Sequence, residues 1–301
     1  MVSTTLAERK SRRHKLVAAY RALDGLFPFL HHQRPKPSWS NVATMESIIL
    51  AERKRRRHKL VATYRALDGL DSCLSPADLE KVGIRQIPMT LEGVDCPTFF
   101  APYKSAVEKP DTDSDDDIPF EEFEEFEQDP FYNAYDHATY LSEFFNHCIL
   151  PDDESEPAGA EYSDWGDFGF GNLFELTGDS RWRVKMTWHM PESDVPHIVV
   201  TMVSEMAEGQ ALFHGEIKTA IGIMHRRLKT SALRQHIIAP VLIFSVIREH
   251  CLRVIEAYHD GEQLVMRTTP LVDLREADDD LFIKLSRWCL GGPSSKPTTP
   301  T

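Results

Sequence analysis

An acidic segment divides this chain and limits which parts of it can form a folded core. Between Glu108 and Glu156 there are 18 acidic residues and a single basic one, Lys109, and prolines stand at positions 110, 119, 130 and 151. Such a run buries too little apolar surface to offset the entropy of ordering the chain, and the prolines break any long helix. We therefore expect residues 108–160 to be largely disordered, apart from a short helix near 138–149 docked on the domain that follows.

Aromatic residues are interleaved with the acids of this segment. Phe120, Phe123 and Phe126 recur every three residues among glutamates. Acidic-aromatic alternation of this kind is typical of disordered docking segments. These three phenylalanines are therefore candidates for docking a protein partner.

The most specific pattern in the chain is a duplication near its N-terminus. LAERKSRRHKLVAAYRALDGL at residues 6–26 returns as LAERKRRRHKLVATYRALDGL at residues 50–70, and Met1 aligns with Met45. Two near-identical copies are too few for a solenoid and indicate a recent tandem duplication or a misplaced start codon. We therefore expect Met45 to be the natural start and residues 1–44 to be a duplicated basic helix added before it. Residues 45–72 are expected to form a basic helix, because their apolar residues recur at helical spacing and Asp68-Gly69 marks its end.

Charge is unevenly distributed between this basic part and the rest of the chain. Residues 1–70 hold 15 Lys/Arg against 5 Asp/Glu, a net charge of +10, while the whole chain carries −13. The densest block consists of Lys54, Arg55, Arg56, Arg57 and Lys59. Dense cations gain affinity for phosphates by releasing counterions, so this block is a candidate nuclear localisation signal or nucleic-acid contact. The alternative is a solvated basic helix face, or one neutralised by the acidic segment of the same chain.

Downstream of the acidic segment, apolar residues recur with the periods that are typical of strands and of helices. We expect one mixed α/β domain over residues 171–290, with a mostly antiparallel sheet made of a strand-strand-strand-helix-strand core, a hairpin and a C-terminal helix. The expected strands are Trp182–His189, Ile198–Met206, Ala211–Lys218, Val241–Ile247, Leu252–Tyr258 and Gln263–Arg267, and the expected helices are Ala220–Leu233 and Asp279–Leu290. The N-terminal half is expected to be helical and disordered, with residues 73–107 as a linker with a short helix. Residues 291–301 are expected to be a disordered tail.

One pattern within this core combines residue types that take part in catalysis. Glu216-Ile217-Lys218 ends the third expected strand, where residues two apart share a face. This order of elements, with Glu-x-Lys on the third strand, resembles the PD-(D/E)XK nuclease superfamily over about Arg181–Ile247, and similar segments occur in proteins of filamentous fungi. The resemblance implies that Glu216 ligates Mg²⁺ and that Lys218 orients the attacking water, with Asp194 as the second metal-binding carboxylate.

The spacing of the second carboxylate departs from that pattern. A turn near residue 208 places Thr201 opposite Glu216, whereas Asp194 falls roughly 20 Å further along the strand. A bulge, a bend after Pro196, or a carboxylate from a preceding helix would be needed to complete the site, with Glu143 and Glu175 as candidates. We therefore expect an inactive nuclease-like domain in a protein that binds nucleic acid through its basic block. Two alternatives stay open: an active magnesium-dependent phosphodiesterase, and an adaptor that docks partners through the acidic-aromatic segment.

Cysteine usage and hydropathy bear on the compartment. The 5 cysteines are scattered and form no Cys-x-x-Cys pair, which argues against a disulfide framework or a zinc cluster. No apolar run approaches the roughly 20 residues that span a bilayer, and the basic N-terminus lacks the apolar stretch of a signal peptide. We expect a nuclear or cytoplasmic protein without a membrane partner, and without a cofactor unless the enzyme alternative, which needs Mg²⁺, holds.

Overall fold

The computed structural model describes the chain from residue 39 to residue 300, with gaps. The described residues are 39–104, 107, 135–139, 141–142, 161–164, 169–177, 181–189, 194–206, 211–247, 250–274 and 279–300. The chain divides after Ala43, and the unit Thr44–Thr301 contains the sheet and the helices packed on it. The predicted docking residues Phe120, Phe123 and Phe126 lie outside the described residues.

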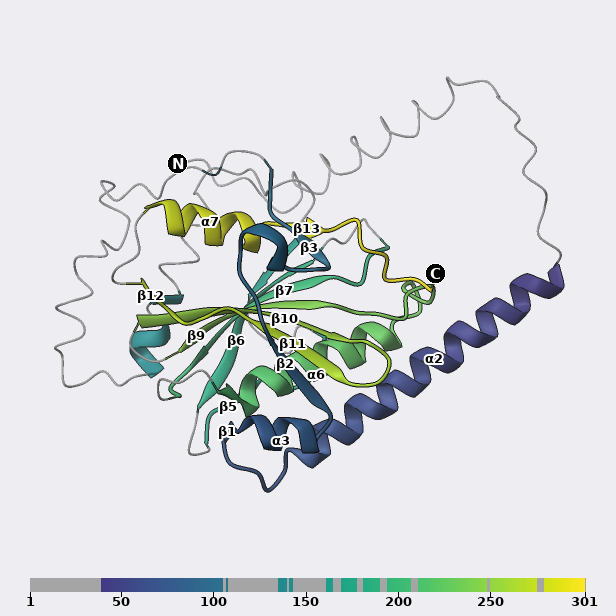
Figure 1. Ribbon diagram of the computed structural model, residues 1–301, viewed down its shortest axis with the longest axis horizontal. Coiled ribbons are helices and arrows are strands. Elements are labelled where there is room, and N and C mark those ends of the chain that lie inside the picture. The colour runs from purple at the N-terminus through teal and green to yellow at the C-terminus, as the bar shows by residue number, and fades with distance from the viewer. Residues whose placement is uncertain are drawn as a thin grey trace, which may run out of the picture. The chain divides into compact units, whose positions relative to one another are not determined.

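A mixed sheet forms the centre of this unit (Figure 1). Its main path runs β2-β11-β10-β9-β7-β6-β4, while β5 pairs with β6 and β12 with β10. β7 pairs in parallel with β9, and β11 in parallel with β2, whereas the other pairs are antiparallel. The prediction of a mixed α/β domain with a mostly antiparallel sheet is therefore confirmed. The strands are β2 (Ile84–Pro88), β4 (Glu161–Asp164), β5 (Phe174–Glu175), β6 (Trp182–His189), β7 (Ile198–Ser204), β9 (Val241–Ile247), β10 (Cys251–His259), β11 (Leu264–Thr268) and β12 (Val272–Asp273).

Helices cover both faces of the sheet (Figure 1). On one face, α2 (Trp39–Ala66), α3 (Pro76–Lys81) and α6 (His214–Lys229) contribute to one buried apolar cluster. On the other face, α7 (Asp279–Cys289) packs in a second cluster together with the helical residues 135–139 and 141–142. The expected short helix near 138–149 thus begins earlier than expected, and its described part is docked on the domain through Ala138 and Leu141. None of the described helices combines the length and apolarity needed to cross a bilayer.

The segment expected to be a linker, residues 73–107, is an integral part of the unit. It contains the expected short helix, α3, but also supplies β2 to the main sheet. Two short pairings attach it further: β1 (Cys73–Leu74) pairs with β8 (Leu212–Phe213), and β3 (Phe100–Ala101) pairs with β13 (Gly292–Pro293). A 3₁₀ turn, η1 (Gly93–Asp95), lies between β2 and β3. The linker prediction is wrong because the strand partners of this segment lie more than 100 residues away in the sequence.

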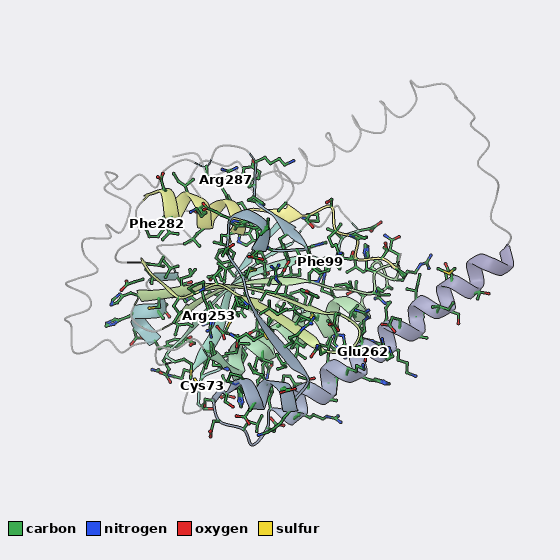
Figure 2. All side chains as sticks on the ribbon, in the orientation of Figure 1. Cys73, Phe99, Arg253, Glu262, Phe282 and Arg287 are labelled. Atoms are coloured by element: carbon green, nitrogen blue, oxygen red, sulfur yellow. The ribbon has the colours of Figure 1, made fainter. Side chains whose placement is uncertain are left out.

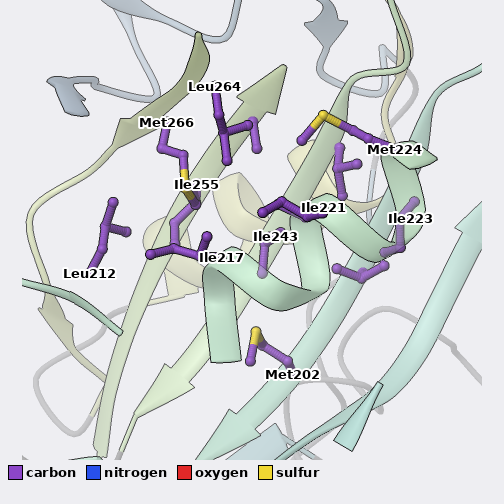
Figure 3. Close-up of a cluster of buried hydrophobic side chains, with 14 of the residues drawn as sticks. Met202, Leu212, Ile217, Ile221, Ile223, Met224, Ile243, Ile255, Leu264 and Met266 are labelled. Carbon is purple, nitrogen blue, oxygen red and sulfur yellow. The ribbon is translucent and has the colours of Figure 1, made fainter. Parts of the chain in front are cut away.

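Helix α6 begins where the sequence predicted a third strand. Figure 3 shows Ile217, Ile221 and Met224 of this helix lying over Ile243 and Ile255 of the sheet. Those three helix positions repeat every three to four residues, the spacing of one helix face. The strand predicted at Ala211–Lys218 is therefore wrong, and only its first apolar pair is extended, as β8. The local alternation around Phe213 was compatible with both periods, and burial of the longer helical stripe decides between them.

The C-terminal segment is held against the domain. The backbone N–H of Ile237 donates to the carbonyl oxygen of Thr298 at 2.9 Å. The ring nitrogen Nδ1 of His236 and the hydroxyl of Thr298 are 2.6 Å apart, and Thr298 is buried. The prediction of a disordered tail is therefore wrong for residues 292–300, because the backbone and one hydroxyl of the tail find partners on the domain.

Candidate functional site

Glu216 lies in the first turn of α6 and is completely buried. Arg253 on β10, at the centre of the sheet in Figure 2, donates Nε and Nη2 to the two carboxylate oxygens of Glu216, the first at 2.7 Å. The backbone N–H of Phe213 also donates to Glu216, so the carboxylate satisfies one of the free donors at the start of the helix. The same nitrogen Nη2 of Arg253 also donates to the carbonyl oxygen of Ala211 at 2.8 Å. Both oxygens of Glu216 are therefore already engaged by the protein.

The other two residues of the predicted metal site do not join Glu216. Lys218 is two residues further along a helix, so it does not share the face of Glu216 as it would on a strand. Its ammonium group lies 5.7 Å from the ring centre of Tyr64 on α2. Asp194 is exposed in the segment before β7, where its backbone oxygen contacts the ring of His236.

The residues present do not fit a divalent cation. The charge of the buried Glu216 carboxylate is already neutralised by a bidentate arginine, and a hard cation needs several oxygen ligands. Within the described ranges, no group of three His, Cys, Asp or Glu side chains is arranged to hold a metal ion. The arrangement of Glu216 supports a structural role, and no catalytic step follows from it.

The basic block on α2 is divided between the interior and the surface. Arg53 and Arg56 are buried, and they donate to backbone carbonyls of the domain. Arg53 contacts four carbonyl oxygens at and beyond the end of α6, those of Leu228, Thr230, Leu233 and His236. The carbonyls of Leu228 and Thr230 lie at the C-terminal end of α6, where they lack partners within the helix and carry its partial negative charge, so a guanidinium is well suited to them.

Arg56 performs the same role at the hairpin between β10 and β11. Its guanidinium donates to the carbonyl oxygens of His259 and Asp260, and its Nε donates to Glu52 at 2.6 Å. Arg56 was predicted to contact nucleic acid, but the structure places it between α2 and this hairpin. It is therefore not exposed to a ligand in this arrangement.

Two further cations of the block, Arg55 and Lys59, form ion pairs with acidic residues. One of these acids, Glu52, is on α2 itself, and the other, Glu262, is in the hairpin between β10 and β11. Arg55 donates to Glu52 at 2.7 Å and to Glu262 at 3.3 Å, and Lys59 lies 3.0 Å from Glu262. Figure 2 labels Glu262 beside α2. Hydrogen bonding to Lys59 and Arg55 lowers the pKa of the Glu262 carboxyl. Hydrogen bonding to Arg55 is the main reason that the pKa of Glu52 falls to about 2.

Arg57 of α2 lies within electrostatic reach of a basic stretch of α6. We call the following six residues the cationic face: Lys54, Arg57 and His58 on α2, and His225, Arg226 and Lys229 on α6. Burial, and then the positive charges of Arg57, Lys229 and Arg226, lower the pKa of His225. The two helices therefore bring cations of both elements within electrostatic reach of each other.

The charge of this face is not neutralised by neighbouring acids in the described part of the chain. Lys54, Arg226 and Lys229 are exposed, and no described carboxylate forms an ion pair with them. Arg57 is half-buried, and its Nε has no hydrogen-bond partner among the described groups. A buried guanidinium N–H without an acceptor is unfavourable, and an anion placed against this face would supply one.

Only part of the cationic face could be identified from the sequence. The basic block was visible from composition, and Arg226 and Lys229 fell within a predicted helix, but nothing local connected the two. The contact between α2 and α6 is tertiary, and it decides which cations of the block remain available. Arg57 and Lys54 stay available, whereas Arg56 does not.

No family model, no curated protein and no solved structure matches this chain. The function proposed below therefore depends on the geometry of the described residues.

Proposed function

We propose that this protein binds nucleic acid through the cationic face of α2 and α6. The observation that carries the proposal is the concentration of basic side chains from two helices without a neutralising carboxylate among the described residues, together with the unpaired Nε of Arg57. Phosphate groups are the biological anions that best match several closely spaced cations. A nuclear or cytoplasmic place of action goes with this proposal.

The binding is expected to follow the phosphate backbone rather than base sequence. The face consists of helix surfaces bearing long flexible cations, which position a nucleic acid without reading it. If Lys54, Arg57, Arg226 and Lys229 each neutralise one phosphate of duplex DNA, the logarithm of the affinity falls with the logarithm of the salt concentration with a slope of about −3.6. Affinity in the range of roughly 10⁻⁴ to 10⁻⁶ M at physiological salt is typical of such contacts.

The test measures binding of the full chain to a labelled 20-base-pair duplex by fluorescence anisotropy over a series of salt concentrations. The variant Lys54→Ala/Arg57→Ala is expected to bind at least tenfold more weakly at low salt, with the salt slope reduced by about 2. The variant Arg226→Ala/Lys229→Ala, on the other helix, should act in the same direction.

A matched control removes two positive charges from the same helix on its other side. Arg55→Ala/Lys59→Ala changes the net charge by the same amount, but these side chains are paired with Glu52 and Glu262. Its affinity should stay within about twofold of the wild type, because surface pairs are already largely neutralised and screened. Equal losses in the two variants, or no loss in either, would mean that the cationic face is not the binding surface.

A further inference from the structure

Helices α2 and α6 lie side by side and run in opposite directions. Near the start of α6, the ammonium group of Lys218 lies 5.7 Å from the ring centre of Tyr64, which is near the end of α2. Near the end of α6, the carbonyl oxygen of Leu228 accepts a hydrogen bond from Arg53 in the middle of α2. The two helices therefore form an antiparallel pair, with Tyr64 and Lys218 at one end of it.

Each helix contributes one accessible stripe of residues to the surface of this pair. Successive members of a stripe are three or four residues apart in the sequence, so each stripe lies on one face of its helix. None of these residues is buried, whereas every other residue of α6 from 215 to 224 is buried. The stripe of α2 consists of Lys54, Arg57, Val61 and Tyr64, and that of α6 consists of Lys218, Gly222, His225 and Lys229.

The two stripes are neighbours, and they connect Tyr64 to the cationic face. Lys218 lies beside the ring of Tyr64 at one end, and Arg57 lies within electrostatic reach of His225 further along the pair. Arg57 and His225 belong to the cationic face, as do Lys54 and Lys229. Tyr64 is therefore an aromatic residue on the same surface as these cations.

The two ends of this surface suit different parts of a nucleic acid. Tyr64 is 39% exposed, and burial followed by the charges of Asp68 and Glu175 raises the pKa of its hydroxyl, so the ring is uncharged at neutral pH. The two acids make this end a poor site for a phosphate. A nucleobase, in contrast, is uncharged, and its flat face stacks on an aromatic ring. The end with Tyr64 therefore suits a base, and the cationic end suits phosphates.

The length of the surface matches a few nucleotides of a single strand. At 1.5 Å per helical residue, Tyr64 lies roughly 10 Å from Arg57 and about 15 Å from Lys54 along α2. The bases of a duplex are paired and stacked inside it, so a duplex held by the cations presents no base face to Tyr64 along its length. A single strand can turn one base toward the ring while its phosphates follow the cations.

We propose that the ligand of the cationic face is single-stranded nucleic acid, with one base stacked on Tyr64 and the adjoining phosphates on the cations of α2 and α6. This inference rests on the proposed function, to which it adds the kind of nucleic acid that is bound. Every base has a face that can stack, so the contact with Tyr64 selects single strands without selecting a base sequence.

The test measures binding of the full chain to three labelled ligands by fluorescence anisotropy: a 20-base oligothymidine, the same oligomer without bases, and the 20-base-pair duplex. The oligomer without bases carries the same phosphate charge, so its difference from oligothymidine reports the bases alone. The protein is expected to bind oligothymidine at least about fivefold more tightly than the oligomer without bases, and more tightly than the duplex. Equal affinity for the two single strands, or tighter binding of the duplex, would overturn the proposal.

Substitutions of Tyr64 locate the stacking. Tyr64→Ala is expected to weaken binding of oligothymidine at least about fivefold and to leave the other two ligands within about twofold of the wild type. The salt slope should not change, because no cation is removed. Tyr64→Phe keeps the ring and should bind oligothymidine as the wild type does. An equal effect of Tyr64→Ala on all three ligands, or no effect on any, would contradict stacking at this residue.

The same ligands separate this inference from the proposed function. Lys54→Ala/Arg57→Ala should weaken binding of all three, because each carries phosphates. If it does so and Tyr64→Ala has no effect, the cationic face binds nucleic acid and only the single-strand inference fails. If Lys54→Ala/Arg57→Ala has no effect on any of the three ligands, both fail.

Discussion

Arg253 and Glu216 form a bidentate ion pair between the central strand β10 and the first turn of α6, and both side chains are shielded from solvent. A buried ion pair is weak evidence of net stability, because both charges are desolvated. The pair also has neutral partners, since the backbone N–H of Phe213 donates to Glu216 and the carbonyl oxygen of Ala211 accepts from Arg253. Removing one member therefore leaves the other buried and uncompensated.

We expect Glu216→Gln to lower the free energy of unfolding by about 3 kcal/mol, because the positive charge of Arg253 then stays buried without a partner. Equilibrium urea denaturation measures this difference. The double variant Glu216→Gln/Arg253→Met should be less destabilised than the sum of the two single variants, since it removes both charges. A loss below about 1 kcal/mol for Glu216→Gln would contradict a structural role for the pair.

Elements with a clear local pattern were predictable from the sequence. β6 and β9 have the predicted bounds, and α7 starts at the predicted residue and ends one residue before the predicted end. Each is bounded by residues that stop a strand or a helix, and each has one dominant period. Their local signal was sufficient because no competing pattern overlapped it.

The candidate site was less predictable because its decisive contacts are distant in sequence. Glu216 followed by Lys218 fits a strand face as a local pattern, but the partner of Glu216 lies 37 residues away. Likewise, the composition of the basic block does not show that Arg53 and Arg56 turn inward to carbonyls about 180 and 200 residues further along. Such contacts form when the helices and strands pack together. They therefore cannot be predicted from the charge pattern of a single segment.

Gly215 is expected to be intolerant of any side chain. A Cβ atom there would lie 2.3 Å from a ring carbon of Phe213 and 2.6 Å from Cγ of Trp182. We expect Gly215→Ala to destabilise the protein by roughly 1–3 kcal/mol despite the better helix propensity of alanine, because two aromatic rings would have to move.

Gly222 in the same helix provides the control for Gly215. A Cβ at Gly222 would meet only a terminal methyl of Leu173 at 3.3 Å and a backbone oxygen at 3.9 Å. A methyl group can shift by a few tenths of an ångström, so Gly222→Ala should be neutral or stabilising by up to about 1 kcal/mol. Thermal denaturation compares the two variants, and equal melting temperatures would contradict the close packing at Gly215.

The hairpin that holds Arg56 is expected to make stability depend on pH. Burial, followed by the positive charge of Arg56, lowers the pKa of His259 to about 4, and the neutral ring accepts the N–H of Gly261. Between pH 6.5 and 4 the unfolded chain binds a proton at His259 that the folded chain does not, so stability is lost as the pH falls. We expect this histidine to contribute up to about 1.4 kcal/mol per pH unit over that range.

The substitution His259→Asn isolates this contribution, because it keeps an acceptor for Gly261 and does not titrate. The free energy of unfolding, measured at intervals from pH 7.5 to 4.5, should fall less steeply in the variant than in the wild type. Some slope should remain, since burial also lowers the pKa of His197 to about 4. Identical slopes in the two proteins would show that His259 titrates freely in the folded state.

The C-terminal tail is expected to contribute to stability even though its composition resembles that of a disordered segment. Truncation after Ser295 removes Thr298, whose carbonyl oxygen accepts the N–H groups of Ile237 and Ile238 and whose hydroxyl contacts His236. Left without these partners, the domain should lose about 2 kcal/mol of unfolding free energy, as measured by urea denaturation. Truncation after Thr299 retains all three contacts and should leave stability within about 0.5 kcal/mol of the wild type. Equal stability of both truncated chains and the wild type would mean that Thr298 does not hold the tail to the domain in solution.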